Sequence, residues 1–235
     1  MTTTEIAQMI DHAVLHPTQT DADLEQACAI ADQWAIKAIC VKPYHVLRTA
    51  ALLSASEVRV CTVIGFPHGG HTTEVKMAET LRALNDGASE IDMVINIGKT
   101  RSADWGYVDA EIEALNTLCI SRHALLKVIF ETDFLPDEES KVRLCEICNR
   151  HRVAFVKTST GFGFVRTPDG HYAYQGATEA DVRLMRAVCT PGIQIKASGG
   201  IRTLDQLLKF HALGATRIGT SSTVEILEEA RQRFG

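Results

Sequence analysis

The sequence lacks several features that would place the chain in a membrane, outside the cell or on a nucleic acid. No apolar run approaches the ~20 residues that a membrane-spanning helix needs. The stretch Met1–Glu5 has no basic region followed by an apolar core, so a secretory signal peptide is not expected. The formal net charge is −5, from 24 basic and 29 acidic residues, and the missing basic excess argues against a general nucleic-acid binder. We therefore expect neither a membrane nor a nucleic-acid partner.

Patterns typical of disulfide frameworks and metal sites are also missing. The seven cysteines are odd in number and scattered, which favours a reducing compartment and hence a cytoplasmic location. Cys145 and Cys148 form a lone CxxC in a predicted helix over 138–151. A zinc or redox role is one interpretation, and we favour the other, half-buried helix cysteines. Because no HxxxH or HExxH spacing unites the histidines, we predict neither a metal nor another cofactor.

The sequence does contain eight short apolar runs that alternate with helical patterns. The runs cover 9–15, 36–41, 58–64, 89–95, 124–131, 153–157, 193–200 and 215–219. Alternating strands and helices predict parallel βα units, and eight strands are the number that closes a TIM barrel of ~250 residues. No low-complexity linker divides the 235 residues. We predict an α/β fold, a single-domain TIM (β/α)8 barrel over residues 1–235.

Lysines lie at or near the ends of two of these runs. Lys157 lies where an apolar run meets the loop Thr158–Gly161. Such a lysine either extends its ammonium group to water or is desolvated and becomes a nucleophile towards carbonyl groups. Lys196 lies near the end of the next run, and two neighbouring ammonium groups favour each other's neutral form. This pairing predicts a lowered pKa for Lys157.

Two aspartates interrupt buried-strand patterns. Asp92 shares one face of its run with Glu90. Because a carboxylate among the surrounding helices would lack a partner, we place Asp92 in the barrel lumen, where it could shuttle protons through a water. Asp11 lies in the first run, either at the site or as a loop cap. Since TIM-barrel chemistry sits at the C-terminal strand ends, we expect both aspartates near Lys157 and Lys196.

Turns rich in glycine and hydroxyl residues follow the last two runs. Gly199 and Gly200 end the seventh run, Gly219 ends the eighth, and Ser221 and Ser222 follow it. Barrels bind phosphate at these positions through backbone N–H groups and a helix N-terminus. An amine nucleophile, a proton shuttle and a phosphate site together predict Schiff-base chemistry on a small phosphorylated carbonyl compound.

One segment, 164–175, breaks the alternation of strands and helices. Its aromatic arms flank Pro168-Asp169-Gly170, which is typical of a hairpin turn. It follows Lys157 closely, so an inserted hairpin should project over the catalytic face. We expect a lid or a subunit contact, and a plain surface loop is the alternative.

The motifs taken together resemble the deoxyribose-phosphate aldolases, class I aldolases with a TIM barrel. The resemblance runs from Ile10 to about Ile226. It rests on IDHAVLHPT (10–18), AICV (38–41), GFPHG (65–69), GASEIDMVINIG (87–98), KVIFET (127–132), FVKTSTGF (155–162), IKASGGIRT (195–203) and ATRIGTSS (215–222).

This resemblance implies a cytoplasmic lyase of deoxyribonucleotide catabolism that reversibly cleaves 2-deoxy-D-ribose 5-phosphate to acetaldehyde and D-glyceraldehyde 3-phosphate. In that family Lys157 would form the Schiff base, Lys196 would lower its pKa and Asp92 would relay protons. The substrate-binding residues would be Asp11, Cys40, Gly161, Gly199, Gly200, Gly219, Ser221 and Ser222. Partners would be the phosphosugar and aldehydes, together with a homo-oligomer, for which we expect a dimer.

Departures from the family pattern leave the acceptor aldehyde open. Ala13 and His16 replace a threonine and a lysine of the usual IDHTLLKPT, and the segment 164–175 separates STGF from GAT. The alternatives are a lysine aldolase with a different acceptor and a sugar-phosphate-binding paralogue without catalysis.

Overall fold

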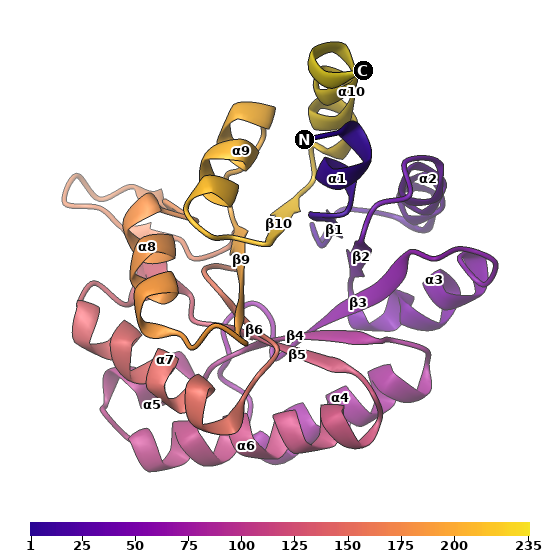
Figure 1. The fold of residues 1–235 in the computed structure, drawn as a ribbon. Helices are drawn as coiled ribbons and strands as arrows, with labels where there is room; N and C mark the ends of the chain where they lie inside the picture. The colour runs from indigo at the N-terminus through magenta and orange to yellow at the C-terminus, as the bar shows by residue number, and fades with distance from the viewer.

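Eight parallel strands close into a barrel in the computed structural model, which describes residues 1–235 (Figure 1). Each barrel strand pairs with the next barrel strand along the chain, and β10 pairs with β1 to complete the ring. The strands are β1 (Ile10–Val14), β2 (Ala38–Val41), β3 (Arg59–Ile64), β4 (Glu90–Val94), β5 (Leu125–Ile129), β6 (Phe155–Lys157), β9 (Gln194–Ser198) and β10 (Arg217–Thr220). The predicted TIM barrel is confirmed.

The helices that follow the strands surround the barrel. They are α2 (Asp21–Gln33), α3 (Val46–Leu52), α4 (Thr73–Asn85), α6 (Trp105–Ser121), α7 (Glu138–His151), α8 (Glu179–Val188), α9 (Leu204–Ala212) and α10 (Thr223–Phe234). Several begin at side-chain caps: Thr20 and Thr203 each form a capping box, and Asp137 accepts from the Ser140 amide at 2.7 Å. These caps satisfy amide groups that a helix start leaves unpaired. No helix has the length and apolarity to span a membrane.

Four short elements were not predicted as separate segments. They are α1 (Thr3–Ala7), η1 (Pro43–His45), α5 (Ile97–Arg101) and η2 (Thr132–Phe134). One or two turns carry too few residues for a helical periodicity to show. The predicted run 124–131 also proves too long, since β5 ends at Ile129 and Glu131 has a left-handed backbone with φ 53°.

Successive residues along a strand point alternately into two interiors, the apolar layer under the helices and the lumen of the barrel. On β4, Ile91 and Met93 are fully buried in the large apolar cluster, while Glu90 and Asp92 take part in a polar network inside the barrel. Burial of each such apolar side chain contributes about 1.5–3 kcal/mol. The apolar cluster therefore fixes the barrel, and the lumen is left for charged groups.

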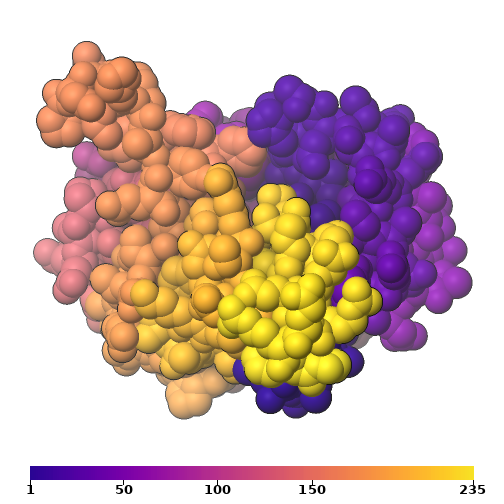
Figure 2. Space-filling model, turned by 90° about the horizontal axis from the view of Figure 1, so that it is seen from above, coloured from indigo at the N-terminus to yellow at the C-terminus, as the bar shows by residue number.

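A small antiparallel ribbon lies between β6 and α8. Its strands β7 (Val165–Arg166) and β8 (Tyr172–Ala173) pair around Pro168 and Asp169, and the Phe164 and Tyr174 rings meet edge to face at 5.2 Å. Figure 2 shows this segment as an orange lobe at the upper left, standing out from the rounded body. Because β6 still pairs with β9, the ribbon extends a loop without interrupting the barrel.

Candidate active site

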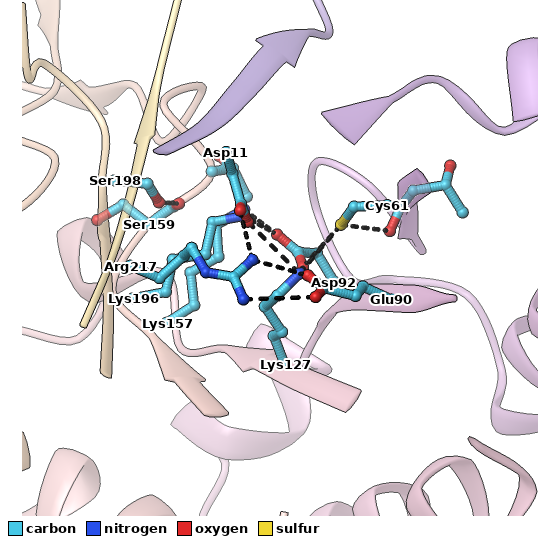
Figure 3. Close-up of polar contacts among 12 residues, drawn as sticks. Asp11, Cys61, Glu90, Asp92, Lys127, Lys157, Ser159, Lys196, Ser198 and Arg217 are labelled. Carbon is cyan, nitrogen blue, oxygen red and sulfur yellow. Dashed lines mark hydrogen bonds and ion pairs between the residues drawn. The ribbon is translucent and has the colours of Figure 1, made fainter. Parts of the chain in front are cut away.

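The strand register places two lysines side by side inside the barrel. Lys157 on β6 is directly opposite Lys196 on β9. Both Nζ atoms donate to Asp92 Oδ2, each at 2.7 Å, from β4 across the lumen (Figure 3). All three side chains are buried, with Lys157 only 3% exposed. The register thus brings together the three residues that were predicted to be catalytic.

Asp11 extends this arrangement into a larger charge network. It accepts from Lys196 and, at 2.6 Å, from Arg217. Lys127 lies 2.7 Å from Asp92 Oδ1 and 2.7 Å from Glu90 Oε2. The buried network therefore contains three carboxylates (Asp11, Glu90 and Asp92) and four cations (Lys127, Lys157, Lys196 and Arg217). Each carboxylate contacts at least two cations.

Mutual attraction outweighs desolvation in this network. Burial favours the neutral form of Asp92, but Lys127, Lys157 and Lys196 hold its pKa well below the usual range. Burial likewise opposes the charged form of Lys196, but the carboxylates of Asp11 and Asp92 raise its pKa. Asp92 is therefore an anion and Lys196 a fixed cation at neutral pH.

Two thiols line the same lumen. Cys40 and Cys61 are paired in register on β2 and β3, and Cys61 Sγ lies 3.2 Å from Asp92 Oδ1 and 3.1 Å from Lys127 Nζ. Cys40, Cys61 and Asp92 gather within a spacing that a metal could use, as do Asp11, Cys61 and Glu90. However, the carboxylates already accept hydrogen bonds from ammonium and guanidinium groups, whose charge repels a cation. The donor set fits amine chemistry better than a metal.

The loop after Lys157 is bonded to the end of β9. Thr158 Oγ1 donates to the Ser198 carbonyl at 3.1 Å and accepts from the Ser198 amide at 3.1 Å. Ser198 Oγ donates to the Ser159 carbonyl at 2.5 Å (Figure 3). These bonds fix the position of the lysine-bearing loop relative to the turn that follows Lys196.

A cavity of about 640 Å³ opens on the C-terminal side of the lysines. Of the predicted binding residues, it is lined by Gly161, Gly199, Gly200, Gly219 and Ser221. The backbone of Gly199 has φ 93°, and a Cβ atom added there would lie 2.9 Å from the Cα atom of Gly176. Only glycine therefore fits at this position.

Ser222 does not line this cavity, because it sits at the start of α10, where its amide donates to Thr220 Oγ1 at 3.0 Å. The substituted positions Ala13 and His16 do line it, as do Phe164 and Tyr174 of the hairpin.

Comparison with known proteins identifies the family. The model of the DeoC/LacD family aldolases matches residues 5–228. The chain belongs to the DeoC/LacD aldolase family. It is 45% identical over 231 residues to a deoxyribose-phosphate aldolase of Rhodopirellula baltica, covering 98% of this chain and 91% of the relative. A deoxyribose-phosphate aldolase of Thermococcus gammatolerans is 46% identical, with 97% of each chain covered.

A solved structure supports the assignment to this family. A tetrameric deoxyribose phosphate aldolase from Aeropyrum pernix superposes with a TM-score of 0.86 at 30% identity, covering 97% of this chain and 92% of that one. The DeoC/LacD chain described here thus shares its whole barrel with aldolases.

Part of the charge network was not predicted from the sequence. Lys127 occupies the middle of β5 and Arg217 is the first residue of β10, and Glu90 was used only to orient Asp92. A charged residue within an otherwise apolar run was a usable signal, since such a group needs a buried partner of opposite charge. Glu131, which lies beyond the end of β5, gave no comparable signal.

Proposed function

We propose that this aldolase reversibly cleaves 2-deoxy-D-ribose 5-phosphate to acetaldehyde and D-glyceraldehyde 3-phosphate through a Schiff base on Lys157. One observation carries the proposal: Lys157 and Lys196 lie in register on adjacent strands and share Asp92, below a cavity with phosphate-type turns. The names of the curated relatives support the substrate.

The proposed reaction begins at the Lys157 amine. Its nitrogen adds to the C1 aldehyde of the open-chain sugar, and loss of water from the carbinolamine gives an iminium ion. Breaking the C2–C3 bond releases glyceraldehyde 3-phosphate as the C3 hydroxyl loses its proton, and the electron pair of that bond forms an enamine on Lys157. Protonation at C2 and hydrolysis then release acetaldehyde and restore the amine.

The charge network supports this role for Lys157. When Lys157 is neutral, the three buried cations Lys127, Lys196 and Arg217 match the three carboxylates. The partly exposed Arg59 adds one further contact to Glu90, at 3.3 Å. Asp92 contacts both lysines and is held as an anion, which suits it to relay protons through a water during carbinolamine breakdown. Lys196, fixed as a cation, disfavours a second positive charge beside it.

Binding roles follow from position. We assign the phosphate to the backbone amides of Gly161, Gly199, Gly200 and Gly219 and to Ser221. Ser222 would contribute only through the start of α10. Asp11 would orient Lys196, and Cys40 would line the lumen beside Cys61.

Borohydride trapping tests the proposal. Acetaldehyde and sodium borohydride should label Lys157 with an ethyl group that peptide mass spectrometry locates. Lys157→Ala should lose both the label and the activity, whereas Lys99→Ala, which removes a partly exposed lysine paired with Asp104, should keep both. No label on the wild type, or a label that survives Lys157→Ala, would refute the mechanism.

A second candidate is a lysine aldolase with another acceptor. Ala13, His16 and the hairpin residues Phe164 and Tyr174 all line the cavity, so the departures from the family pattern lie where an acceptor would bind. A panel of phosphorylated and plain aldehydes separates the two. Poor turnover of deoxyribose 5-phosphate with good turnover of another pair would favour this candidate. Binding without any turnover would instead indicate a paralogue that has lost catalysis.

We also propose that the chain forms a homo-oligomer, in the first place a dimer, and that it acts in the cytoplasm. Each chain would be a single functional domain. Tyr44 and Leu47 are 68% and 59% exposed on neighbouring turns, an apolar surface that self-association would cover. The seven cysteines are free and buried, which suits a reducing compartment. Light scattering of the purified protein gives the oligomeric state directly.

A further inference from the structure

Glu131 is a buried carboxylate that the proposed mechanism does not use. Its side chain is fully buried just beyond β5, and no lysine, arginine or histidine lies within ion-pair distance of it. The carboxylates of the charge network, in contrast, each contact two or more cations. Glu131 instead accepts hydrogen bonds from Thr160, from the backbone amide at 3.2 Å and from the hydroxyl.

Thr160 connects this carboxylate to the cavity. It lines the cavity beside Gly161, three residues after Lys157. Its Oγ1 accepts from the Phe162 amide at 2.9 Å while its hydroxyl hydrogen is donated to Glu131. An ionised Glu131 therefore holds the hydroxyl hydrogen of Thr160 away from any ligand.

Protonation of Glu131 would reverse this bond. The carboxyl O–H would donate to Thr160 Oγ1, which also accepts from Phe162, so the hydroxyl hydrogen of Thr160 would have to turn elsewhere. The cavity that Thr160 lines is the open direction. A negatively charged ligand there would also raise the proton affinity of a nearby buried carboxylate.

We infer that binding of the phosphorylated substrate is coupled to uptake of one proton by Glu131, which frees the Thr160 hydroxyl to donate into the cavity. The proton comes from solvent, and no covalent bond of the substrate changes in this step. The inference rests on the proposed function, because that function supplies the phosphorylated ligand.

The surroundings of Glu131 make such uptake accessible near neutral pH. Burial raises the pKa of Glu131 to about 7, against the two hydrogen bonds from Thr160. Two charged groups act on it: Asp133, on the adjoining η2, raises its pKa and Lys157, on β6, lowers it. At pH 8 Glu131 is therefore mostly ionised in the free protein and able to take up a proton.

Calorimetry with sn-glycerol 3-phosphate tests the coupling. This ligand has a phosphate but no carbonyl, so the wild-type enzyme cannot turn it over. At pH 8 the phosphate, with a pKa of ~6, is already a dianion. Binding enthalpies measured in buffers of different ionisation enthalpy should show uptake approaching one proton per ligand in the wild type. Glu131→Gln should bind with near-zero uptake.

His16 is the competing site for proton uptake, because its side chain also lines the cavity. Uptake that persists in Glu131→Gln and disappears in His16→Gln would overturn the inference. Thr160→Val gives a second test that keeps Glu131. Loss of the hydroxyl bond should raise the proton affinity of Glu131, so the pH of maximal uptake should move upward. An unchanged maximum would contradict the coupling.

Failure of the inference is distinguishable from failure of the proposed function. Acetaldehyde carries no phosphate, so borohydride should still label Lys157 in Glu131→Gln. A labelled variant with wild-type proton uptake refutes the coupling alone. A wild type that takes no label refutes the aldolase mechanism.

Discussion

Two buried ionic systems in this barrel behave in opposite ways. In the lumen, Asp92 contacts three ammonium groups and Asp11 contacts Lys196 and Arg217. Outside the barrel, Lys76 of α4 and Glu111 of α6 form an isolated pair at 2.8 Å, both fully buried. The Lys76 ammonium also donates to the Val94 carbonyl at 2.8 Å.

The difference appears in the direction of the pKa shifts. Burial lowers the pKa of Lys76 and raises that of Glu111, and their mutual attraction does not overcome it. In the lumen, the attraction of several partners overcomes burial, so the pKa of Asp92 falls and that of Lys127 rises. One partner is therefore too few to hold a buried charge firmly, and several partners fix it. In this aldolase the several-partner arrangement surrounds the reactive amine of Lys157.

The largest expected effect comes from removing one cation of the lumen. In Lys196→Leu, Lys157 loses a repelling neighbour and Asp92 loses a competing partner, and both changes favour the protonated amine. The pH–rate profile should shift towards higher pH, and activity at neutral pH should fall. Steady-state rates between pH 6 and 10 measure this. An unchanged profile would mean that burial alone tunes Lys157.

The isolated pair should respond in stability instead of activity. Lys76→Met leaves Glu111 buried without its cation and should cost about 3–5 kcal/mol of unfolding free energy. The double variant with Glu111→Gln, whose amide oxygen can still accept from the Asn96 amide, should recover most of this. Urea unfolding measures both variants, and the pH–rate profile should not move. A single variant as stable as the wild type would mean that the pair carries no buried charge.

The smallest effect is expected at the hairpin. Replacing Val165–Tyr174 with a short glycine linker removes the Tyr174 ring from the cavity wall and leaves the lysines untouched. We expect KM for phosphorylated substrates to change several-fold while acetaldehyde labelling of Lys157 stays the same. Light scattering on the same variant shows whether the hairpin holds subunits together. If neither KM nor oligomeric state changes, the hairpin serves neither as a lid nor as a subunit contact.

The barrel was predictable because its strands stand out in the sequence as short apolar runs. A β-branched run such as Val60–Ile64 is buried at every residue in the closed parallel sheet, so it appears in the sequence as a continuous stretch. Alternation along β4 left two faces for Asp92, and the lack of a partner among the helices placed it in the lumen. The lysine pair was predicted because Lys157 ends one apolar run and Lys196 lies near the end of the next, and parallel pairing places the two residues opposite each other.

What the sequence does not reveal are contacts that depend on an unusual backbone. Glu131 appeared to continue a strand, but its left-handed conformation turns the carboxylate towards Thr160. Non-glycine residues rarely adopt that conformation, and nothing in the local sequence marks one. The partners of Lys127 and Arg217 were likewise hidden, because they lie on strands far apart in the chain.

The pairing of β6 with β9 also matters for protein engineering. The chain leaves the barrel after Lys157, forms the hairpin and α8, and returns with Lys196 in register, so the reactive pair tolerates extra residues between its members. Segment 164–175 is thus a site for loop replacement. Libraries of loops can be inserted there and screened for activity on new aldehydes, while Lys157 and its neighbours keep their positions.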